Sequence, residues 1–251
     1  MPTKKKSTIK QLTRREALEA FGAAAAMALT AAACGDSTTT PTGSSSTTTS
    51  TTGGTTNASC AITPSETEGP YPDRLGLIGN QSFFRRDVTE GKPGLPLTLA
   101  LTVVASNKSC APVQNAVVEI WHCDAAGNYS EYSQPGFDGS GQTFLRGFQT
   151  TDANGQVTFT SIYPGWYGGR ATHIHVEVFV NGASVKTTQV AFPESVTSAV
   201  YATGVYASKG RNPTSNSGDM VFSDGTSLEL VTLTGSTASG YTAALTVSLN
   251  A

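Results

Sequence analysis

Residues 173–182 read His-Ile-His-Val-Glu-Val-Phe-Val-Asn-Gly, and a stretch rich in Val and Thr follows at 184–192. Valine, isoleucine, threonine and phenylalanine are typical of β-strands. Asn-Gly tolerates the positive φ angles that a tight turn between two strands requires. The segment therefore predicts two neighbouring strands joined by a turn.

Similar short apolar stretches occur on both sides of this pair, at residues 97–105, 116–123, 155–162, 227–233 and 241–248. The chain also contains 26 glycines and 12 prolines, and no convincing amphipathic helix follows its first 34 residues. These features predict an all-β fold, and seven short strands at close spacing favour a two-sheet β-sandwich. Long loops at 129–142 and 201–218 interrupt the pattern, and we expect such loops to carry the active site.

The first 34 residues have the order of an export signal. Lysines 4–6 and the pair Arg14-Arg15 precede an Ala-rich run at 20–33. Two adjacent arginines resemble a twin-arginine signal. A basic amphipathic helix is the alternative, but the alanines at 23–26 leave it without a polar face.

Cys34 follows three alanines and precedes Gly35-Asp36, which resembles a bacterial lipoprotein cleavage site. The usual leucine three places before the cysteine is absent, so plain cleavage with release is the alternative to a lipid anchor. We expect an exported protein in either case, periplasmic, lipid-anchored at the cell surface or extracellular. Residues 35–58 are almost entirely Ser, Thr and Gly and predict a flexible tether. One folded domain, 59–251, remains.

The charge of the chain excludes one class of partner. The formal net charge is -2 and only 14% of the residues are charged. Nucleic-acid binding needs a basic field that this composition does not provide.

Three cysteines remain in the folded part, and an exported protein can keep a disulfide. Sequence alone allows three pairings. We favour Cys60 with Cys110, because both have polar, loop-like surroundings, whereas Cys123 follows the apolar run 117–121 and is expected to be buried.

His173 and His175 are two residues apart in a predicted strand. Alternate strand residues point to the same side, with Cα atoms about 6.5 Å apart, so both imidazoles can reach one metal ion. A polar strand face would give the same alternation, but the chain has only three histidines. The third, His122, follows Trp121 in another predicted strand, where we expect a hydrogen-bonded structural histidine beside a core tryptophan.

Two tyrosines stand where predicted strands run into loops. Tyr129 lies beyond the strand at 116–123, and Tyr167 lies in the turn that precedes His173. Side chains at such positions often serve chemistry. If the turn lies elsewhere in this segment, Tyr163 is the alternative to Tyr167 as the second candidate tyrosine.

The motifs around these histidines and tyrosines, taken in their order along the chain, resemble the signature of the intradiol ring-cleavage dioxygenases. The leader and the Ser/Thr-rich tether resemble the exported branch of that family. The resemblance of the motifs covers roughly residues 63–192. It rests on Trp121-His122, Gly127-x-Tyr129-Ser130, Arg146-Gly147-x-Gln149, Pro164-Gly165-x-Tyr167 and Arg170-x-x-His173-Ile174-His175.

The resemblance implies an Fe(III) ion held by Tyr129, Tyr167, His173 and His175. Hard phenolate oxygens favour iron(III) over iron(II). It also implies that a catechol-type aromatic diol and O2 are the substrates and that cis,cis-muconate-type products form. In the implied mechanism, Tyr167 leaves the iron when the diol binds and helps to accept a proton.

Other residues match positions around the family's substrate pocket. Arg170 is implied to stabilise negative charge on the substrate, and Gln189 to be a second polar group beside it. The segment 67–71 is similar to one that borders the pocket, so Tyr71 is expected to contact substrate. Only residues 168–172 separate Tyr167 from His173, which predicts a more open pocket than in many members. The family's helical dimerisation segment is not recognisable, so the oligomeric state stays open.

Two other classes of function remain at this stage. A transthyretin-like or carbohydrate-binding surface module would share the fold without catalysis. A zinc or copper protein would use His173, His175 and a carboxylate such as Glu177, which lies on the same strand face. The identity of the metal distinguishes these cases.

Overall fold

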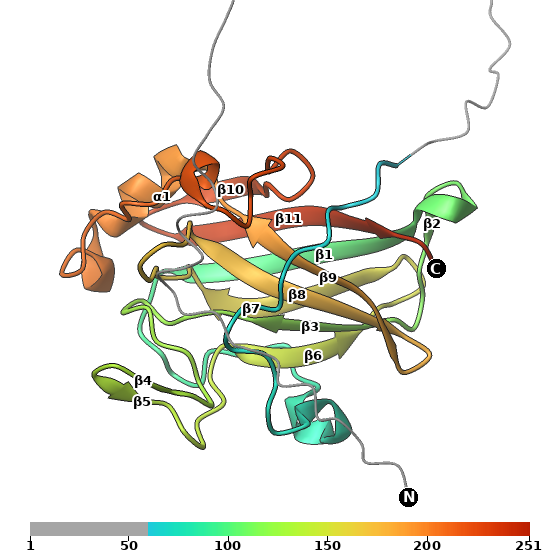
Figure 1. The fold of residues 1–251 in the computed structure, drawn as a ribbon, viewed down its shortest axis with the longest axis horizontal. Coiled ribbons are helices and arrows are strands. Elements are labelled where there is room, and N and C mark those ends of the chain that lie inside the picture. Colours follow the sequence, from blue (N-terminus) through green and yellow to red (C-terminus); the bar gives the residue numbers. More distant parts are fainter. Residues whose placement is uncertain (1–59) are drawn as a thin grey trace, which may run out of the picture. The chain divides into compact units, whose positions relative to one another are not determined.

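Two sheets pack face to face in residues 60–251, the part of the chain that the computed structural model describes (Figure 1). One sheet has the order β10-β11-β1-β2, with β7 also paired to β1, and the other has the order β6-β3-β8-β9. The first sheet is formed by β1 (Pro96–Ala105), β2 (Ala111–Pro112), β7 (Gln156–Ile162), β10 (Thr232–Ser236) and β11 (Gly240–Leu249). The second is formed by β3 (Val117–Trp121), β6 (Arg146–Thr150), β8 (His173–Val180) and β9 (Ala183–Ala191). The expected all-β sandwich is confirmed.

The core lies between the two sheets, and β1 shows the alternation of buried and exposed side chains that faces it. In β1, Leu97, Leu99 and Leu101 are buried and the residues between them are partly exposed. They belong to one apolar cluster with side chains of the second sheet such as Val118 and Val176.

The strand β11 lies between β10 and β1 and pairs with β1 in parallel, from Leu97 opposite Tyr241 to Ala105 opposite Leu249. All other pairs of named strands are antiparallel in the described part of the chain. The predicted pair of strands on either side of Asn181-Gly182 is confirmed as β8 and β9, with a turn at residues 181–182.

Short helices connect the strands. The α-helix α1 (Glu194–Tyr201) was not expected, because eight residues after Pro193 are too few to show helical periodicity. The 3-10 helices are η1 (Leu77–Gly79), η2 (Gln81–Phe83), η3 (Ser106–Lys108), η4 (Gly204–Tyr206) and η5 (Asn216–Gly218). Within residues 60–251, no helix is long and apolar enough to cross a membrane.

The two long loops lie at the same end of the sandwich (Figure 1). The loop 129–142 contains the small hairpin β4 (Ser133–Gln134) and β5 (Phe137–Asp138), and the loop 201–218 contains η4 and η5. Two expectations need correction. The strand β6 was not predicted, and the strand predicted at 227–233 begins only at Thr232, after a bridge between Leu230 and Ala191.

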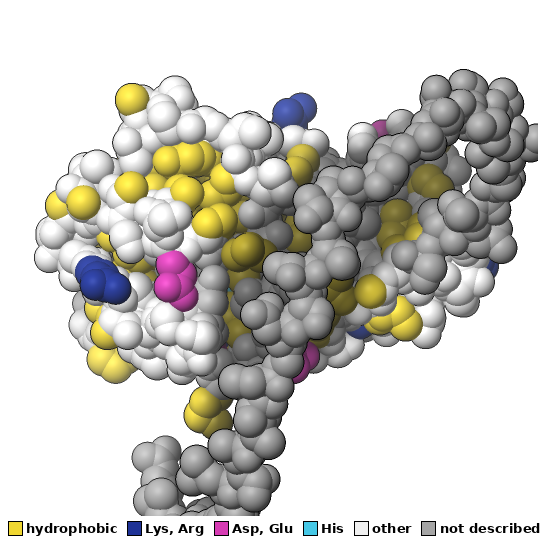
Figure 2. All heavy atoms as spheres, turned by 90° about the horizontal axis from the view of Figure 1, so that it is seen from above, with side chains coloured by type: hydrophobic (Ala, Val, Ile, Leu, Met, Phe, Trp, Pro, Cys, Tyr) yellow, Lys and Arg dark blue, Asp and Glu magenta, His cyan; other side chains and the backbone are white. Residues whose placement is uncertain are grey.

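Cys60 and Cys110 form a disulfide with Cα atoms 5.7 Å apart, and Cys123 is a buried thiol. The signal at 1–34, with Cys34, and the tether at 35–58 lie outside the described residues. Figure 2 shows a face on which hydrophobic and uncharged side chains predominate, and the few charged side chains in that view are scattered rather than gathered into a patch of one sign.

Candidate metal centre

Tyr129 reaches the site through a loop that is closed on Asp124. The Asp124 carboxylate accepts hydrogen bonds from the backbone of Ala126 and Asn128, at 3.0 and 2.9 Å, and pairs with Lys92 at 3.0 Å. This loop returns the chain at the end of β3 toward β8, and Tyr129 follows it directly.

Tyr167 lies in the turn between β7 and β8. The carbonyl of Pro164 accepts a hydrogen bond from Tyr201 at 3.0 Å, and Trp166 donates to the carbonyl of Gly210 at 2.9 Å. Gly165 allows the turn to lie against the first loop, because a Cβ there would collide with the carbonyl oxygen of Asp124. The loop 201–218 thus holds the turn that carries Tyr167.

Four side chains converge on one point. The Nε2 atoms of His173 and His175 are 3.2 Å apart, and the hydroxyl oxygens of Tyr129 and Tyr167 each lie 3.4 Å from His173 Nε2. The structure therefore brings together all four residues that sequence analysis proposed as ligands.

The tautomer of His173 suits a metal ligand. Its Nδ1 lies 2.6 Å from the carbonyl oxygen of Ala171, which can only accept, so Nδ1 carries the proton and Nε2 presents a lone pair to the cluster. Burial, with a contribution from Arg170, lowers the pKa of His173 to about 3. Burial and the neighbouring His173 hold the pKa of His175 well below its usual value. Both rings are therefore neutral and able to donate to a metal.

The two tyrosines differ in exposure. Tyr129 is 1% exposed, whereas Tyr167 is only partly buried. Burial raises the pKa of Tyr129 well above its usual value and that of Tyr167 to about 12. A bound cation would have to displace both phenolic protons, and metal binding would therefore release protons.

A second set of side chains holds His175. The ring of Trp121 stacks on its imidazole at 4.7 Å between centroids and an angle of 4°. On the segment 66–71, Gly69 approaches so closely that a Cβ would lie 2.9 Å from His175 Cε1. Nδ1 of His175 is buried and has no hydrogen-bond partner among the described residues, so packing rather than a hydrogen bond fixes this side of the ring.

Tyr71 covers the cluster from the same segment. Its ring stacks on Tyr129 at 4.4 Å and meets Tyr167 edge-on at 6.3 Å. The predicted substrate contact thus lies beside two of the four converging side chains.

Arg170 and Gln189 form a polar arm beside the cluster. Arg170 Nε donates to both carboxylate oxygens of Asp219, at 3.0 and 2.8 Å, and its NH2 donates to Gln189 Oε1 at 2.5 Å. Its NH1 lies 3.5 Å from both Tyr167 Oη and His173 Nε2. Gln189 is fully buried opposite His175 on β9 and donates to the carbonyl of Thr67 at 2.8 Å.

Sequence analysis did not anticipate three supporting residues. Arg146 is fully buried, pairs with Glu119 and Glu131 at 3.0 and 2.8 Å, and donates to the carbonyl of Tyr71 at 2.7 Å. Arg146 appeared only as a motif position, and Asp219 stands in a long loop without a recognisable pattern. Gly69 could have been noticed from the Gly-Pro pair at 69–70, which marks a tight turn.

The remaining candidates lie away from the cluster. His122 binds the carbonyl of Cys123 at 2.9 Å and Ser161 Oγ at 2.7 Å, as expected of a structural histidine. Tyr163 is buried in the main core and binds Thr197. Glu177 accepts a hydrogen bond from Ser184 and does not form a three-ligand cluster with the two histidines of β8.

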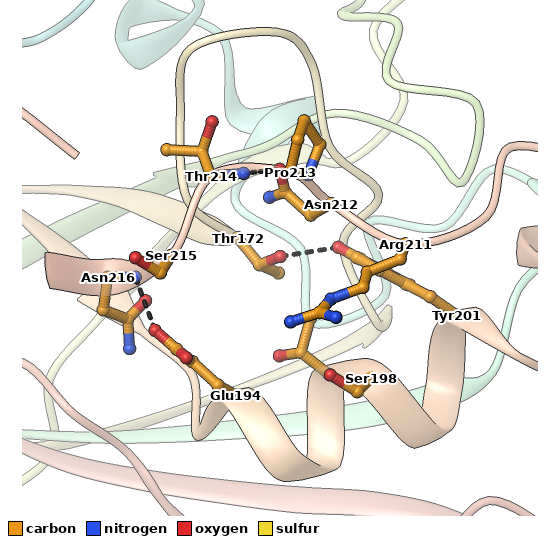
Figure 3. A pocket seen from close by; sticks show the side chains of 11 residues that line it. Thr172, Glu194, Ser198, Tyr201, Arg211, Asn212, Pro213, Thr214, Ser215 and Asn216 are labelled. Carbon is orange, nitrogen blue, oxygen red and sulfur yellow. Dashed lines mark hydrogen bonds between the residues drawn. The ribbon is translucent and has the colours of Figure 1, made fainter. Parts of the chain in front are cut away.

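A small cavity of about 60 Å³ lies behind the start of β8 (Figure 3). Thr172 and Tyr201 hydrogen-bond to each other on its wall at 2.7 Å, and Glu194 accepts from the backbone of Asn216 at 2.7 Å. None of the four converging side chains lines it. The cavity has room for a few water molecules. Residues of the loop 201–218 line it, so it belongs to that loop and not to the cluster.

The donor set fits a ferric ion. Ligand atoms about 2 Å from one ion are about 3 Å apart when their bonds make a right angle, and the separations of 3.2 to 3.4 Å around His173 Nε2 are close to this value. Two phenolic oxygens and two imidazole nitrogens suit a hard, trivalent metal better than a soft one. An all-β sandwich with such a cluster at one end defines a class of non-haem metalloproteins.

Comparison with known proteins identifies the family within that class. A family model described as "Dioxygenase" matches residues 68–209, more than half of the chain. Catechol 1,2-dioxygenase 2 of Acinetobacter lwoffii is 35% identical over 148 residues, which are 51% of this chain and 50% of that protein. The chain belongs to the intradiol ring-cleavage dioxygenase family, as its motifs suggested.

Solved structures agree. An intradiol ring-cleavage dioxygenase from Tetranychus urticae matches with a TM-score of 0.69 and 28% identity, over 76% of this chain and 95% of that one. The dioxygenase domain of a dioxygenase and carbohydrate-binding fusion from Streptomyces sp. SirexAA-E matches with a TM-score of 0.54 and 26% identity, over 76% and 99%. The chain spans about half the length of the catechol dioxygenases that it matches in sequence.

Proposed function

We propose that the protein binds Fe(III) through Tyr129, Tyr167, His173 and His175 and uses O2 to open the ring of a catechol-type diol between its hydroxyl-bearing carbons. The observation that carries this proposal is the convergence of four donor atoms, three of which lie within 3.4 Å of the fourth, His173 Nε2. Membership of the family supports it, as do relatives named for intradiol ring cleavage and for catechol 1,2-dioxygenation. Bound ferric iron would supply the oxidising centre that draws electron density from the diol, so that O2 can react with a ring carbon.

Tyr167 is the better placed of the two tyrosines to receive a proton from the diol at its Oη. It is partly exposed, whereas Tyr129 is enclosed and stacked under Tyr71. A phenolate that would take up a hydroxyl proton must be able to move, and Tyr167 is the less buried of the two tyrosines. The half-buried ring of Tyr71 offers an aromatic wall for the diol.

Arg170 places a positive charge beside the reacting oxygens. Its NH1 lies 3.5 Å from Tyr167 Oη, and Asp219 and Gln189 fix the guanidinium from behind. A fixed cation at this position favours the deprotonated diol and the carboxylates of the product. Ring opening gives a cis,cis-muconate-type product that keeps both atoms of O2.

A non-catalytic binding module would not need this arrangement. Two neutral imidazoles and two phenols around one point form a donor set for a metal ion, and no observation favours the carbohydrate-binding alternative. Zinc or copper held by a carboxylate is not supported either, because Glu177 hydrogen-bonds to Ser184 instead.

We also propose that the protein works outside the cytoplasm. The Cys60–Cys110 disulfide supports this, because such bonds persist mainly in oxidising compartments. Mass spectrometry of the mature N-terminus would distinguish lipid attached at Cys34 from simple cleavage.

The test of the catalytic proposal is product analysis with labelled oxygen. The purified iron-loaded chain is incubated with catechol and ¹⁸O2, and the product is identified by mass and absorbance. A cis,cis-muconate with two ¹⁸O atoms is the expected result. A colourless protein that does not retain iron would contradict the ligand assignment, and an iron-loaded protein that cleaves catechol next to the two hydroxyl carbons, rather than between them, would contradict the intradiol reaction.

A further inference from the structure

Three carboxylates from two segments meet away from the four-ligand cluster. Glu66 begins the segment 66–71 that carries Tyr71, and the exposed Asp224 and the buried Glu229 lie in the connection between η5 and β10. One ligand atom from each lies within 4.8 Å of the other two. Among the described residues, this is the one group of three or more acidic, histidine or cysteine side chains with such spacing.

Glu229 has one carboxylate oxygen with no hydrogen-bond partner of good geometry in the described chain, although the backbone of Gln189 also interacts with this carboxylate. Its side chain is fully buried, and Oε1 accepts a hydrogen bond from Thr188 Oγ1 at 3.0 Å. Oε2 is buried and has no hydrogen-bond partner. Buried polar atoms are almost always paired, so this oxygen is available to a ligand.

The nearby cations are committed elsewhere. Lys186 Nζ donates to the carbonyl of Thr63 and to Ser65 Oγ, each at 2.8 Å, and forms no ion pair with Glu229. Arg170, which acts electrostatically on Glu66, is bound to Asp219. No side-chain cation therefore neutralises the group directly.

The group is electrostatically unfavourable without a counter-ion. Burial first, and then the charges of Glu66 and Asp224, raise the pKa of Glu229 to about 7. Burial and Asp224 also raise the pKa of Glu66, against an opposing effect of Arg170. A divalent cation would remove the repulsion and occupy the free oxygen of Glu229.

We propose that Glu66, Asp224 and Glu229 bind a calcium ion. Carboxylate oxygens are the ligands that calcium prefers, at 2.3 to 2.6 Å, so oxygens on opposite sides of the ion lie about 5 Å apart. Three oxygens within 4.8 Å of one another fit such a sphere. Magnesium binds at about 2.1 Å in a strict octahedron and retains several waters, so it fits this spacing less well.

Calcium here would join two segments that hold the four-ligand cluster. The backbone of Glu66 is pinned to β9 by a hydrogen bond from its N–H to the carbonyl of Thr187 at 2.9 Å, and three residues later Gly69 packs against His175. Asp224 and Glu229 follow Asp219, which anchors Arg170. The proposed calcium site is structural and does not depend on the proposed reaction.

The test is calcium binding by the iron-loaded chain, measured by isothermal titration at pH 8 and by thermal unfolding with and without calcium. We expect one calcium per chain with a dissociation constant of about 10⁻⁴ M, as in other weak extracellular sites. Glu229→Gln and Glu66→Gln should each weaken binding by about tenfold or more and abolish the thermal shift. Glu68→Gln, which removes an exposed carboxylate outside the group, is the control and should change neither.

Wild-type protein that binds no calcium at pH 8, or a folded Glu229→Gln variant that binds it as tightly as wild type, would overturn the proposal. Magnesium binding as tight as calcium binding would overturn the choice of ion. Calcium affinity should also increase from pH 6 to pH 8, because Glu229 loses its proton over this range. The charged groups that face Glu229 are Glu66, Asp224 and Lys186. Circular dichroism confirms that each variant is folded.

Discussion

The indole ring of Trp121 and the imidazole ring of His175 lie parallel, 4.7 Å apart between centroids. Metal-binding histidines usually have their second nitrogen fixed by a hydrogen bond. Nδ1 of His175 has no such partner among the described residues, so the indole face replaces it as the element that sets the plane of the ring.

Replacing Trp121 should therefore affect iron binding. We expect Trp121→Leu to weaken iron affinity by about tenfold, as supporting residues of metal sites usually do, and Trp121→Phe to keep most of it because an aromatic face remains. Iron titration followed by visible absorbance measures both. Equal affinities for the two variants would show that stacking does not orient His175.

The contact between Gly69 and His175 gives a second test. Gly69 has a φ of +71°, and a Cβ there would lie 2.9 Å from His175 Cε1. We expect Gly69→Ala to reduce iron retention. Gly76→Ala is a matched control, because Gly76 has a φ of +67° and open space around it, so it carries the backbone strain without the collision. If both variants lost iron equally, strain alone would be responsible.

The two tyrosine ligands should respond differently to loss of the hydroxyl group. We expect Tyr129→Phe to lose most of its iron, since Tyr129 is enclosed, and Tyr167→Phe to retain some iron but lose the proton acceptor. The charge-transfer absorbance should shift in both, and turnover should fall by about 100-fold or more for Tyr167→Phe. Tyr163→Phe, in the core, should leave the visible spectrum unchanged. An unchanged spectrum in Tyr167→Phe would contradict its assignment.

Arg170 should contribute more to turnover than to substrate binding. Arg170→Lys removes the guanidinium that Asp219 and Gln189 hold, and we expect kcat to fall by about 100-fold with a smaller change in KM. Asp219→Asn keeps the charge of Arg170 but weakens its anchor, so we expect an intermediate loss. A rise in KM alone would assign Arg170 to substrate binding only.

The pH dependence of stability should report on Glu229. The pKa of Glu229 is 4.5 for an unperturbed glutamate, as in the unfolded chain, and about 7 in the folded protein. The stability that the protonated form contributes is therefore complete below about pH 4.5 and is lost as the pH rises through about 7. In calcium-free buffer, the Tm of wild type should fall between pH 5 and pH 8 by about 5 °C more than that of Glu229→Gln. Glu119, whose pKa burial raises to about 8, titrates in both proteins and cancels in the comparison. Parallel pH profiles would contradict the shift.

Sequence patterns identified the sandwich because apolar residues alternate in β1 and β8, and because β9 is rich in Val and Thr. They could not identify β6, whose sequence Arg-Gly-Phe-Gln-Thr begins with an arginine that sequence rules place at the surface. Arg146 is nevertheless fully buried, because Glu119 and Glu131 lie on either side of it. Neither carboxylate is near it in sequence.

Strand alternation and strand ends are local features, so they brought out His173, His175 and the two tyrosines as candidates. The complete set of four ligands followed from the resemblance to the family. The supporting contacts were not predictable, since Asp219, Gly69 and Trp121 reach the cluster only through tertiary packing. The group of Glu66, Asp224 and Glu229 could not be predicted for the same reason. Residues 227–231 were predicted to be part of a strand, but they form a turn in which Glu229 is buried.

The place of β11 between β10 and β1 has a consequence for biosynthesis. The first sheet lacks an interior strand until residues 240–249 have left the ribosome, although its partner β1 is synthesised more than a hundred residues earlier. Until then the nascent chain would expose the flank of β1, and chaperones that shield unpaired strand edges are expected to engage it there. The first sheet is therefore completed only after residues 240–249 have emerged.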